Sequence, residues 1–248
     1  MTTPFAGRPR VSSREAGPYT AVVFDFYGTL AIRRGDSEPL RDILARYGYT
    51  ADDDAIWRFF NDGIDGTTHH EHSLSREHYI DWQRVRFLGL LRDLGVDDEH
   101  HEPVNTALRA AWGVGEMEAY PETAAVLAEL RRRNAQLLIC SNWDWDLREA
   151  VVDAGLHDHV DDMVSSAWVG ARKPHPHIYE HTLELVDAHP AEVLFVGDTW
   201  SCDVEGPAAA GLTPVYVRRS DRDPDHTRPS DATTTYEFAD LTGLLDIV

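Results

Sequence analysis

Several polar side chains follow short apolar runs along this chain, and the first of them is a carboxylate. Asp25 ends the apolar run of residues 21–24 and is followed by Gly28 and Thr29. A run without polar alternation predicts a strand that is buried on both faces. In an open parallel sheet, ligands bind at the carboxyl ends of the strands. A strand that ends in an Asx turn would look the same, so this stretch alone leaves both interpretations open.

Further candidate residues occupy equivalent places downstream, each at or just beyond the end of an expected strand. They are Ser141 and Asn142 after residues 137–139, Lys173 after residues 162–166, and Asp198 and Asp203 after residues 193–196. Because parallel strands present their carboxyl ends along one edge of a sheet, we expect these side chains to converge around Asp25.

This order of Asp, Ser, Lys and paired Asp resembles the haloacid dehalogenase (HAD) superfamily of hydrolases, in the branch that carries a helical cap after the first motif (subfamily IA-like). The resemblance covers residues 19–218, which is most of the chain. It implies that Asp25 is a nucleophile and that Lys173 bridges Asp25 and the transferred group. It also implies that Ser141 donates a hydrogen bond to a phosphoryl oxygen.

A magnesium cofactor is expected at the same place. Mg²⁺ prefers oxygen ligands in an octahedral shell that retains several waters, and Asp25 and Asp198 would supply two of these oxygens. The resemblance adds the backbone carbonyl of Tyr27 and makes Asp203 a direct or water-mediated ligand. Asp198 could instead be an Asx-turn residue and Asp203 a helix N-cap, and the latter could serve as both cap and ligand.

Lys173 is distinctive in composition as well as in position. It is the only lysine among the 23 basic residues, and all the others are arginine. A compact ammonium can sit as a point charge between two anionic groups, which a planar guanidinium cannot do in the same space. The sequence therefore indicates that this position requires lysine specifically.

Tyr27 departs from the pattern of the phosphatases in this superfamily, where the second residue after the nucleophile is usually an Asp that acts as general acid and base. The run Asp-x-Tyr-Gly-Thr resembles the true haloacid dehalogenases. Those enzymes, however, lack the acidic Gly-Asp that this chain keeps as Gly197 and Asp198. Three functions remain open: a Mg²⁺-dependent phosphatase on a small phosphorylated metabolite, a metal-independent 2-haloacid dehalogenase, and a phosphate-binding protein with weakened catalysis.

Strands that alternate with helices predict an α/β fold, with a Rossmann-like, doubly wound parallel sheet and right-handed crossovers. Apolar residues recur at helical spacing between residues 39 and 112, which predicts an inserted α-helical cap. We expect a flexible N-terminal tail over residues 1–18, a catalytic core over residues 19–31 and 114–248, and the cap over residues 32–113. The spacing in residues 238–247 predicts a last packing helix.

Substrate contacts are expected from both parts of the chain. Thr29 and Asn142 lie beside the expected catalytic residues, and the cap could supply Arg58 or Arg84, although either could equally be a surface arginine. Trp200 is the candidate aromatic contact among four tryptophans near strand ends; the others are Trp143, Trp145 and Trp168. At least two of the four should be packing residues, and one in the pocket would favour a substrate with an apolar or aromatic body.

The formal net charge of −20 argues against nucleic acid or an anionic membrane as a partner, because both would be repelled. An anionic substrate would have to be attracted by local positive charge. The first residues contain no apolar core, which predicts neither a signal peptide nor a membrane span. We expect a cytoplasmic enzyme with a small-molecule substrate, either monomeric or homodimeric.

Overall fold

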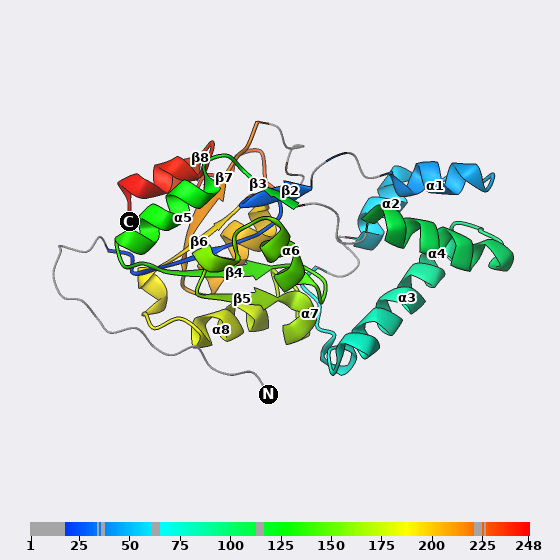
Figure 1. The fold of residues 1–248 in the computed structure, drawn as a ribbon, viewed down its shortest axis with the longest axis horizontal. Helices are drawn as coiled ribbons and strands as arrows, with labels where there is room; N and C mark the ends of the chain where they lie inside the picture. The colour runs from blue at the N-terminus through cyan, green and yellow to red at the C-terminus, as the bar shows by residue number, and fades with distance from the viewer. Residues whose placement is uncertain are drawn as a thin grey trace.

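A six-stranded parallel sheet forms the centre of the molecule, and its strand order is β5-β4-β1-β6-β7-β8 (Figure 1). The computed structural model describes residues 18–33, 35, 38–60, 65–112, 117–220, 225 and 227–248. The strands are β1 (Ala21–Phe24), β4 (Gln136–Ser141), β5 (Asp162–Ser165), β6 (Val193–Gly197), β7 (Thr213–Val217) and β8 (Tyr236–Phe238). The predicted α/β fold with a parallel sheet is confirmed.

β1 lies inside the sheet, and all four of its residues are buried. Phe24 pairs with Ile139 of β4 on one side and with Val196 of β6 on the other. The backbone amide of Asp25 extends the pairing by donating to the carbonyl of Val196 (2.8 Å). The carboxyl ends of β1, β4 and β6 therefore meet at one level, which is where the candidate residues follow them.

Alternate side chains of β1 enter two apolar clusters, one on each face of the sheet. Val22 and Phe24 pack in the cluster that includes α5, α6 and η5, while Ala21 and Val23 pack in the cluster that includes α8. The helices and turns around the sheet are α5 (Thr123–Arg132), α6 (Leu147–Asp153), η2 (His157–His159), α7 (Ser166–Val169), α8 (Pro176–Glu184), η3 (Pro190–Glu192), η4 (Trp200–Glu205), α9 (Gly206–Ala209) and η5 (Leu241–Asp246). In Figure 1, α5 and α8 lie on opposite sides of the sheet.

A helical insertion interrupts the chain after the first strand and lies beyond one end of the sheet (Figure 1). It contains α1 (Leu40–Arg46), α2 (Asp53–Phe60), η1 (His70–His72), α3 (Arg76–Asp93) and α4 (Asp98–Trp112). Its own apolar cluster joins α1, α3 and α4 through residues such as Ile43, Leu91 and Val104. A short antiparallel pair, β2 (Ala31–Arg33) with β3 (Met117–Ala119), lies where the chain leaves the sheet and returns to it.

Two of the predicted domain boundaries involve residues outside the described part of the chain. The tail predicted over residues 1–18 is described only at residue 18, and the cap boundary predicted between residues 113 and 114 falls in an undescribed segment. In the described part, no helix is both long enough and apolar enough to cross a membrane.

The last packing helix predicted over residues 238–247 is shorter than expected and is a 3₁₀ helix, η5, over Leu241–Asp246. Its buried residues Leu241 and Leu244 are spaced by three and lie on one side of it, in the same apolar cluster as α5. Residues 236–238 form β8, a strand that was not predicted, which pairs in parallel with β7. A π-helical turn, η4, precedes the short helix α9.

Two glycines, Gly206 in the core and Gly89 in the insertion, test how closely the structure is packed around each position. At Gly206, an added Cβ would collide with the Tyr179 hydroxyl, which donates to the Cys202 carbonyl (2.6 Å). At Gly89, inside α3, an added Cβ would meet nothing within 4 Å. We expect Gly206→Ala to lower the free energy of unfolding by about 1–3 kcal/mol through overpacking. Gly89→Ala should raise it by up to about 1 kcal/mol through helix propensity.

Urea unfolding followed by circular dichroism measures both changes. Because both variants replace glycine by alanine in a helix, they differ only in the space around the new methyl group. A Gly206→Ala variant as stable as the wild type would contradict the close packing of α9 against Tyr179.

Candidate active site

Asp25 stands at the carboxyl end of β1 and is held by two donors. The Ser141 hydroxyl donates to Asp25 Oδ1 (2.9 Å), and the Lys173 ammonium donates to the same oxygen (2.8 Å). Ser141 is the last residue of β4, the strand next to β1. The three predicted residues are thus brought together, with Asp25 itself 7% exposed. Two donors on one oxygen fix the rotation of the carboxylate.

Lys173 is one of the most buried charged residues in the described chain. Its ammonium lies between Asp25 and Asp203 and donates to Asp203 Oδ1 (2.6 Å), with the side chain only 2% exposed. Burial opposes the charged form, but the carboxylates of Asp203 and Asp25 outweigh it and raise the pKa of Lys173 well above its usual value. The ammonium is therefore a fixed positive charge between two acids.

Three carboxylates form a potential metal site. One oxygen from each of Asp25, Asp198 and Asp203 lies within 4.8 Å of the others. Asp203 is fully buried, and its Oδ2 accepts from the Thr199 amide (2.9 Å). Burial, with further contributions from Asp25 and Asp198, raises the pKa of Asp203 despite Lys173. Hard oxygen donors of this kind fit Mg²⁺.

Gly197, the last residue of β6, makes room for this arrangement. A Cβ at this position would collide with the carboxylate of Asp203. The absence of a side chain lets Asp203 reach back over the strand end from η4. Asp203 belongs to η4 and is not the helix N-cap considered as an alternative, because Thr199 occupies that position. A ligand role for the backbone carbonyl of Tyr27 stays a prediction.

Asn142 holds the loop that carries Lys173. Its side-chain oxygen accepts from the Lys173 amide (2.7 Å), and its Nδ2 donates to the Lys173 carbonyl (3.0 Å). The same Nδ2 also lies 3.2 Å from Asp65 of the helical insertion, which pairs with Arg172 (3.0 Å). Asn142, predicted to bind substrate, therefore has a positioning role. Sequence reasoning missed Asp65 and Arg172, because no local pattern marks a pair separated by 107 residues.

Tyr27 and Thr29 differ in their access to solvent. The Tyr27 side chain is 37% exposed, and its ring lies 6.3 Å from the ring of Trp143. Thr29 is fully buried, and within the described chain its hydroxyl has no hydrogen-bond partner. The Thr29 carbonyl accepts from Arg219 (2.7 Å). Tyr27 is thus accessible to solvent, whereas Thr29 is not.

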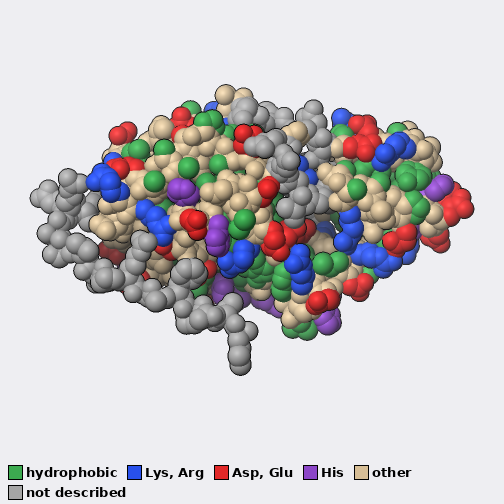
Figure 2. All heavy atoms as spheres, viewed as in Figure 1, with side chains coloured by type: hydrophobic (Ala, Val, Ile, Leu, Met, Phe, Trp, Pro, Cys, Tyr) green, Lys and Arg blue, Asp and Glu red, His purple; other side chains and the backbone are tan. Residues whose placement is uncertain are grey.

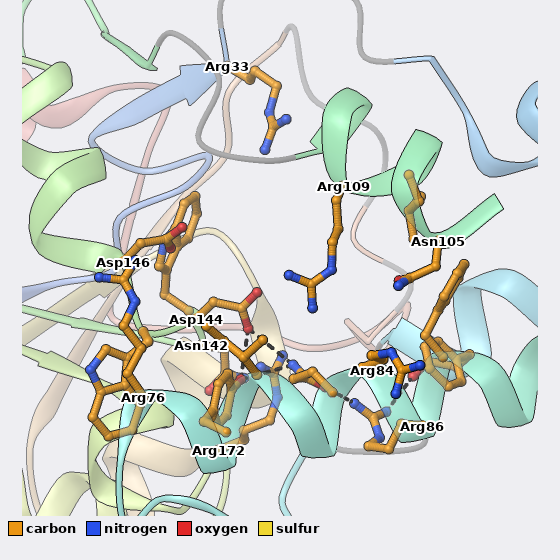
Figure 3. A pocket seen from close by; sticks show the side chains of 18 residues that line it. Arg33, Arg76, Arg84, Arg86, Asn105, Arg109, Asn142, Asp144, Asp146 and Arg172 are labelled. Atoms are coloured by element: carbon orange, nitrogen blue, oxygen red, sulfur yellow. Dashed lines mark hydrogen bonds between the residues drawn. The ribbon is translucent and has the colours of Figure 1, made fainter. Parts of the chain in front are cut away.

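A cavity of about 600 Å³ separates the helical insertion from the segment 142–146 (Figure 3). Its walls combine aromatic side chains, including Trp143 and Trp145, with several arginines. Basic side chains also gather on the visible surface between the sheet and the insertion, while acidic ones gather at the far end of the insertion (Figure 2).

Arg58 and Trp200, both predicted to contact the substrate, do not line this cavity. Arg58 is exposed on α2 and is not among the lining residues, whereas Arg84 is. Trp200 is buried against Tyr216 and donates through Nε1 to Glu205 (3.1 Å), so it is a packing residue. For Arg58, helical spacing alone could not show which face of α2 meets the cavity.

Comparison with known proteins agrees with the arrangement of these residues. The model of the haloacid dehalogenase-like hydrolases matches residues 19–211, so this chain belongs to that family. The resemblance read from the sequence is therefore confirmed. A phosphoserine phosphatase of Thermus thermophilus is 40% identical over 107 residues, which cover 43% of this chain and only 43% of that relative.

Two solved structures, of enzymes with different activities, have the same fold as this chain over more than nine tenths of its length. A HAD phosphatase from Thermococcus onnurineus is 25% identical, with a TM-score of 0.58 over 92% of this chain and 97% of that chain. An L-2-haloacid dehalogenase from Xanthobacter autotrophicus is also 25% identical, with a TM-score of 0.59 over 91% and 96% of the two chains. The fold and the family together define a hydrolase of the HAD type.

The position of Lys173 predicts that arginine cannot replace it. The ammonium occupies a buried site that is bounded by two carboxylates and the Phe195 ring, 5.2 Å away. We expect Lys173→Arg to lower kcat/KM by about 10²-fold or more, because a displaced donor no longer meets the charge that develops in the transition state. The larger guanidinium should also lower stability by about 1–3 kcal/mol.

Steady-state hydrolysis and urea unfolding of the purified variant measure the two effects, and Arg172→Lys is the neighbouring control. Arg172 already pairs with Asp65 through a guanidinium, so a lysine there retains the charge outside the carboxylate cluster. Near-native turnover of Lys173→Arg would show that any cation at this position is sufficient.

Proposed function

We propose that this chain is a Mg²⁺-dependent phosphatase that hydrolyses a small phosphorylated metabolite through a covalent intermediate on Asp25. The observation that carries this proposal is the cluster of three carboxylates around a single ammonium. Carboxylate oxygens gathered this closely are the ligands that Mg²⁺ prefers. A divalent cation held there would add positive charge beside Asp25 and so favour the approach of a phosphoryl group.

The residues of the chain divide the work of phosphoryl transfer. Asp25 attacks phosphorus, and its carboxylate is held in one rotation by Ser141 and Lys173. Lys173 and Ser141 then donate to the phosphoryl oxygens, where negative charge accumulates. Asp25, Asp198, Asp203 and the Tyr27 carbonyl would hold Mg²⁺, which would supply further positive charge when bound. Water finally cleaves the acyl phosphate on Asp25 and restores the carboxylate.

Tyr27 limits the kind of leaving group. A second carboxylic acid at this position would protonate the departing oxygen, and such help is worth about 10²–10⁴ in rate. The partly exposed Tyr27 phenol, beside Trp143, is a much weaker acid. We infer that the enzyme favours substrates whose leaving group needs no proton, such as acyl phosphates.

A 2-haloacid dehalogenase is the second candidate, and Tyr27 is the residue that favours it. In that reaction, Asp25 would displace halide from carbon, no acid would be required, and Asp203 could activate the water that cleaves the ester. Asp198 opposes this candidate, because it would place a further carboxylate near the carboxylate of the halo acid. Solved structures with this fold include a dehalogenase as well as a phosphatase, so the fold itself does not choose between the two reactions.

One panel of assays separates the candidates: phosphate esters, acyl phosphates and 2-chloro acids, each with Mg²⁺ and after removal of metal with EDTA. We expect hydrolysis of phosphates that is lost with EDTA and regained with added Mg²⁺. Release of chloride from a 2-chloro acid, unaffected by EDTA, would instead establish the dehalogenase. Binding of phosphate with turnover of no compound would establish the weakened, phosphate-binding protein.

Asp25→Asn tests the covalent mechanism. The amide matches the carboxylate in volume but is a poor nucleophile, so kcat should fall on the order of 10⁴-fold or more. The fold should remain, because Asp203 still pairs with Lys173. Mass spectrometry of protein quenched during turnover should detect an added phosphoryl group in the wild type and none in the variant. Full activity of Asp25→Asn would exclude Asp25 as the nucleophile.

Tyr27→Asp tests the missing general acid. For a phosphatase, the new carboxylic acid should raise turnover of alkyl phosphates, whose alkoxide must be protonated, by about 10²-fold or more. Acyl and nitrophenyl phosphates should gain far less, so the gain should increase with the basicity of the leaving group. Rates across such a series, with Tyr27→Phe as control, provide the measurement. An equal gain for every leaving group would show that the proton comes from elsewhere, for example from the helical insertion.

A further inference from the structure

The cavity between the helical insertion and the sheet is strongly basic, although the whole chain carries a formal net charge of −20. Six arginines line it: Arg33, Arg76, Arg84, Arg86, Arg109 and Arg172. The only acids in the lining are Asp144 and Asp146, and both accept hydrogen bonds from neighbouring neutral side chains. Clustered arginine in an acidic protein indicates a site that attracts anions.

Three of these arginines already have carboxylate partners. Arg76 pairs with Glu149 (3.2 Å), Arg84 pairs with Glu102, and Arg172 pairs with Asp65 (3.0 Å). Their charges are neutralised locally, so they contribute little to the binding of an anion.

Arg86 lacks such a partner. Its Nη1 donates to the Gln83 side chain (2.6 Å) and its Nη2 to the Phe59 carbonyl (3.1 Å), both of which are neutral. The guanidinium also lies over the rings of Phe59 and Trp82, at 4.7 and 5.1 Å from their centroids. Burial, and then the nearby charge of Arg172, lower the pKa of Arg86. The carboxylate of Asp144 offsets only part of these effects, and within the described chain no carboxylate accepts a hydrogen bond from Arg86.

Arg109 is the second cation without a hydrogen-bonded carboxylate, although Glu102 lies near enough for its pKa to be lowered by the hydrogen bond from Arg84 and, to a smaller extent, by the charge of Arg109. It extends from α4 into the space that faces Asn142 and Asp144 (Figure 3). Within the described chain, it makes no hydrogen bond or ion pair. Arg86 on α3 and Arg109 on α4 therefore present two positive charges to one cavity, with no carboxylate bound to either.

The position of this cavity relates it to the reaction. The segment 142–146, which forms its sheet-side wall, directly follows Ser141, and Arg172 directly precedes Lys173. A phosphoryl group bound at Asp25 by these residues would direct the remainder of the substrate into the cavity. A volume of about 600 Å³ is enough for a small metabolite.

We propose that Arg86 and Arg109 bind a second anionic group of the substrate, a carboxylate or a second phosphate, carried on the leaving group. This inference rests on the proposed phosphatase function. An anion would supply the hydrogen-bonded counter-charge that neither cation has within the described chain, and guanidinium groups suit both carboxylate and phosphate oxygens. The natural substrate is thus a phosphorylated metabolite that carries another acidic group.

Three aryl phosphates with closely matched leaving groups test the proposal, each assayed with Mg²⁺. They are 4-methylphenyl phosphate, 4-(carboxymethyl)phenyl phosphate and 4-(phosphonomethyl)phenyl phosphate, in which a methylene insulates the second anion from the reacting oxygen. We expect kcat/KM to be about tenfold or more higher for at least one charged compound than for the neutral one. The effect should fall mainly on KM. The compound with the larger gain identifies carboxylate or phosphate as the preferred group.

Charge-removing variants assign the effect to residues. The double variant Arg86→Gln/Arg109→Gln should lose the preference, so that the charged and neutral compounds have nearly equal kcat/KM. Arg109→Gln alone should lose part of it without disturbing the fold, because Arg109 contacts no described residue through a hydrogen bond or ion pair. Arg76→Gln is the matched control: it removes an arginine from the same cavity and from the same helix as Arg86, but one that Glu149 already neutralises, and the preference should persist.

The outcomes distinguish this inference from the function on which it rests. Hydrolysis of all three compounds at equal kcat/KM, or a preference that survives in the double variant, would overturn the inference and leave the phosphatase intact. If neither the three compounds nor an acyl phosphate is hydrolysed, the proposed phosphatase and the inference are both overturned. If an acyl phosphate is hydrolysed and none of the three compounds is, the inference alone is overturned. A preference lost in Arg76→Gln as strongly as in the double variant would overturn the assignment to Arg86 and Arg109.

Discussion

The buried ammonium of Lys173, held between Asp25 and Asp203, is the interaction on which the rest of the site depends. Each ion removed from water costs several kcal/mol, so neither carboxylate could be buried here without a cation beside it. The fold meets this requirement by bringing three segments to one point. Asp25 comes from the end of β1, Asp203 from η4 after β6, and Lys173 from the loop before α8. The parallel order of the sheet is what makes these ends neighbours.

The contacts that position Lys173 extend from the sheet into the helical insertion. The side-chain amide of Asn142 accepts from the backbone N–H of Lys173 and donates to the backbone carbonyl of the same residue. Asp65 of the insertion contacts both Asn142 and Arg172. The Gly66 amide also donates to the Lys173 carbonyl (3.1 Å). A residue of the insertion therefore takes part in fixing the catalytic lysine, and the walls of the cavity are built from both parts of the chain. The insertion is structurally coupled to the chemistry and does more than cover it.

The sequence was sufficient for β1 and β4–β7 and for the residues at the ends of these strands, because both depend on local patterns. Apolar runs mark buried strands, and a polar residue after each run marks a strand end, which is how Asp25, Ser141 and Asp203 could be predicted. β8 was missed, because its three residues, Tyr-Glu-Phe, contain no such run. The pair of Asp65 and Arg172 depends on the docking of distant segments, which no local pattern encodes. The contact of Trp200 with Tyr216 likewise depends on how β7 and η4 pack, not on its position near a strand end.

The charges around Asp25 also explain how one fold can serve both reactions found among its structural relatives. Ser141 and Lys173 orient the nucleophile in either case, since attack on carbon and attack on phosphorus both need a fixed carboxylate. The reactions differ in what the other acids must do. Asp198 adds a third carboxylate to the cluster, and a cation bound there would attract phosphate oxygens. In the proposed mechanism, Asp198 therefore bears more directly on the choice of reaction than Tyr27, because a cation that it helps to hold would act on the reacting phosphoryl group, whereas Tyr27 would affect only the departure of the leaving group.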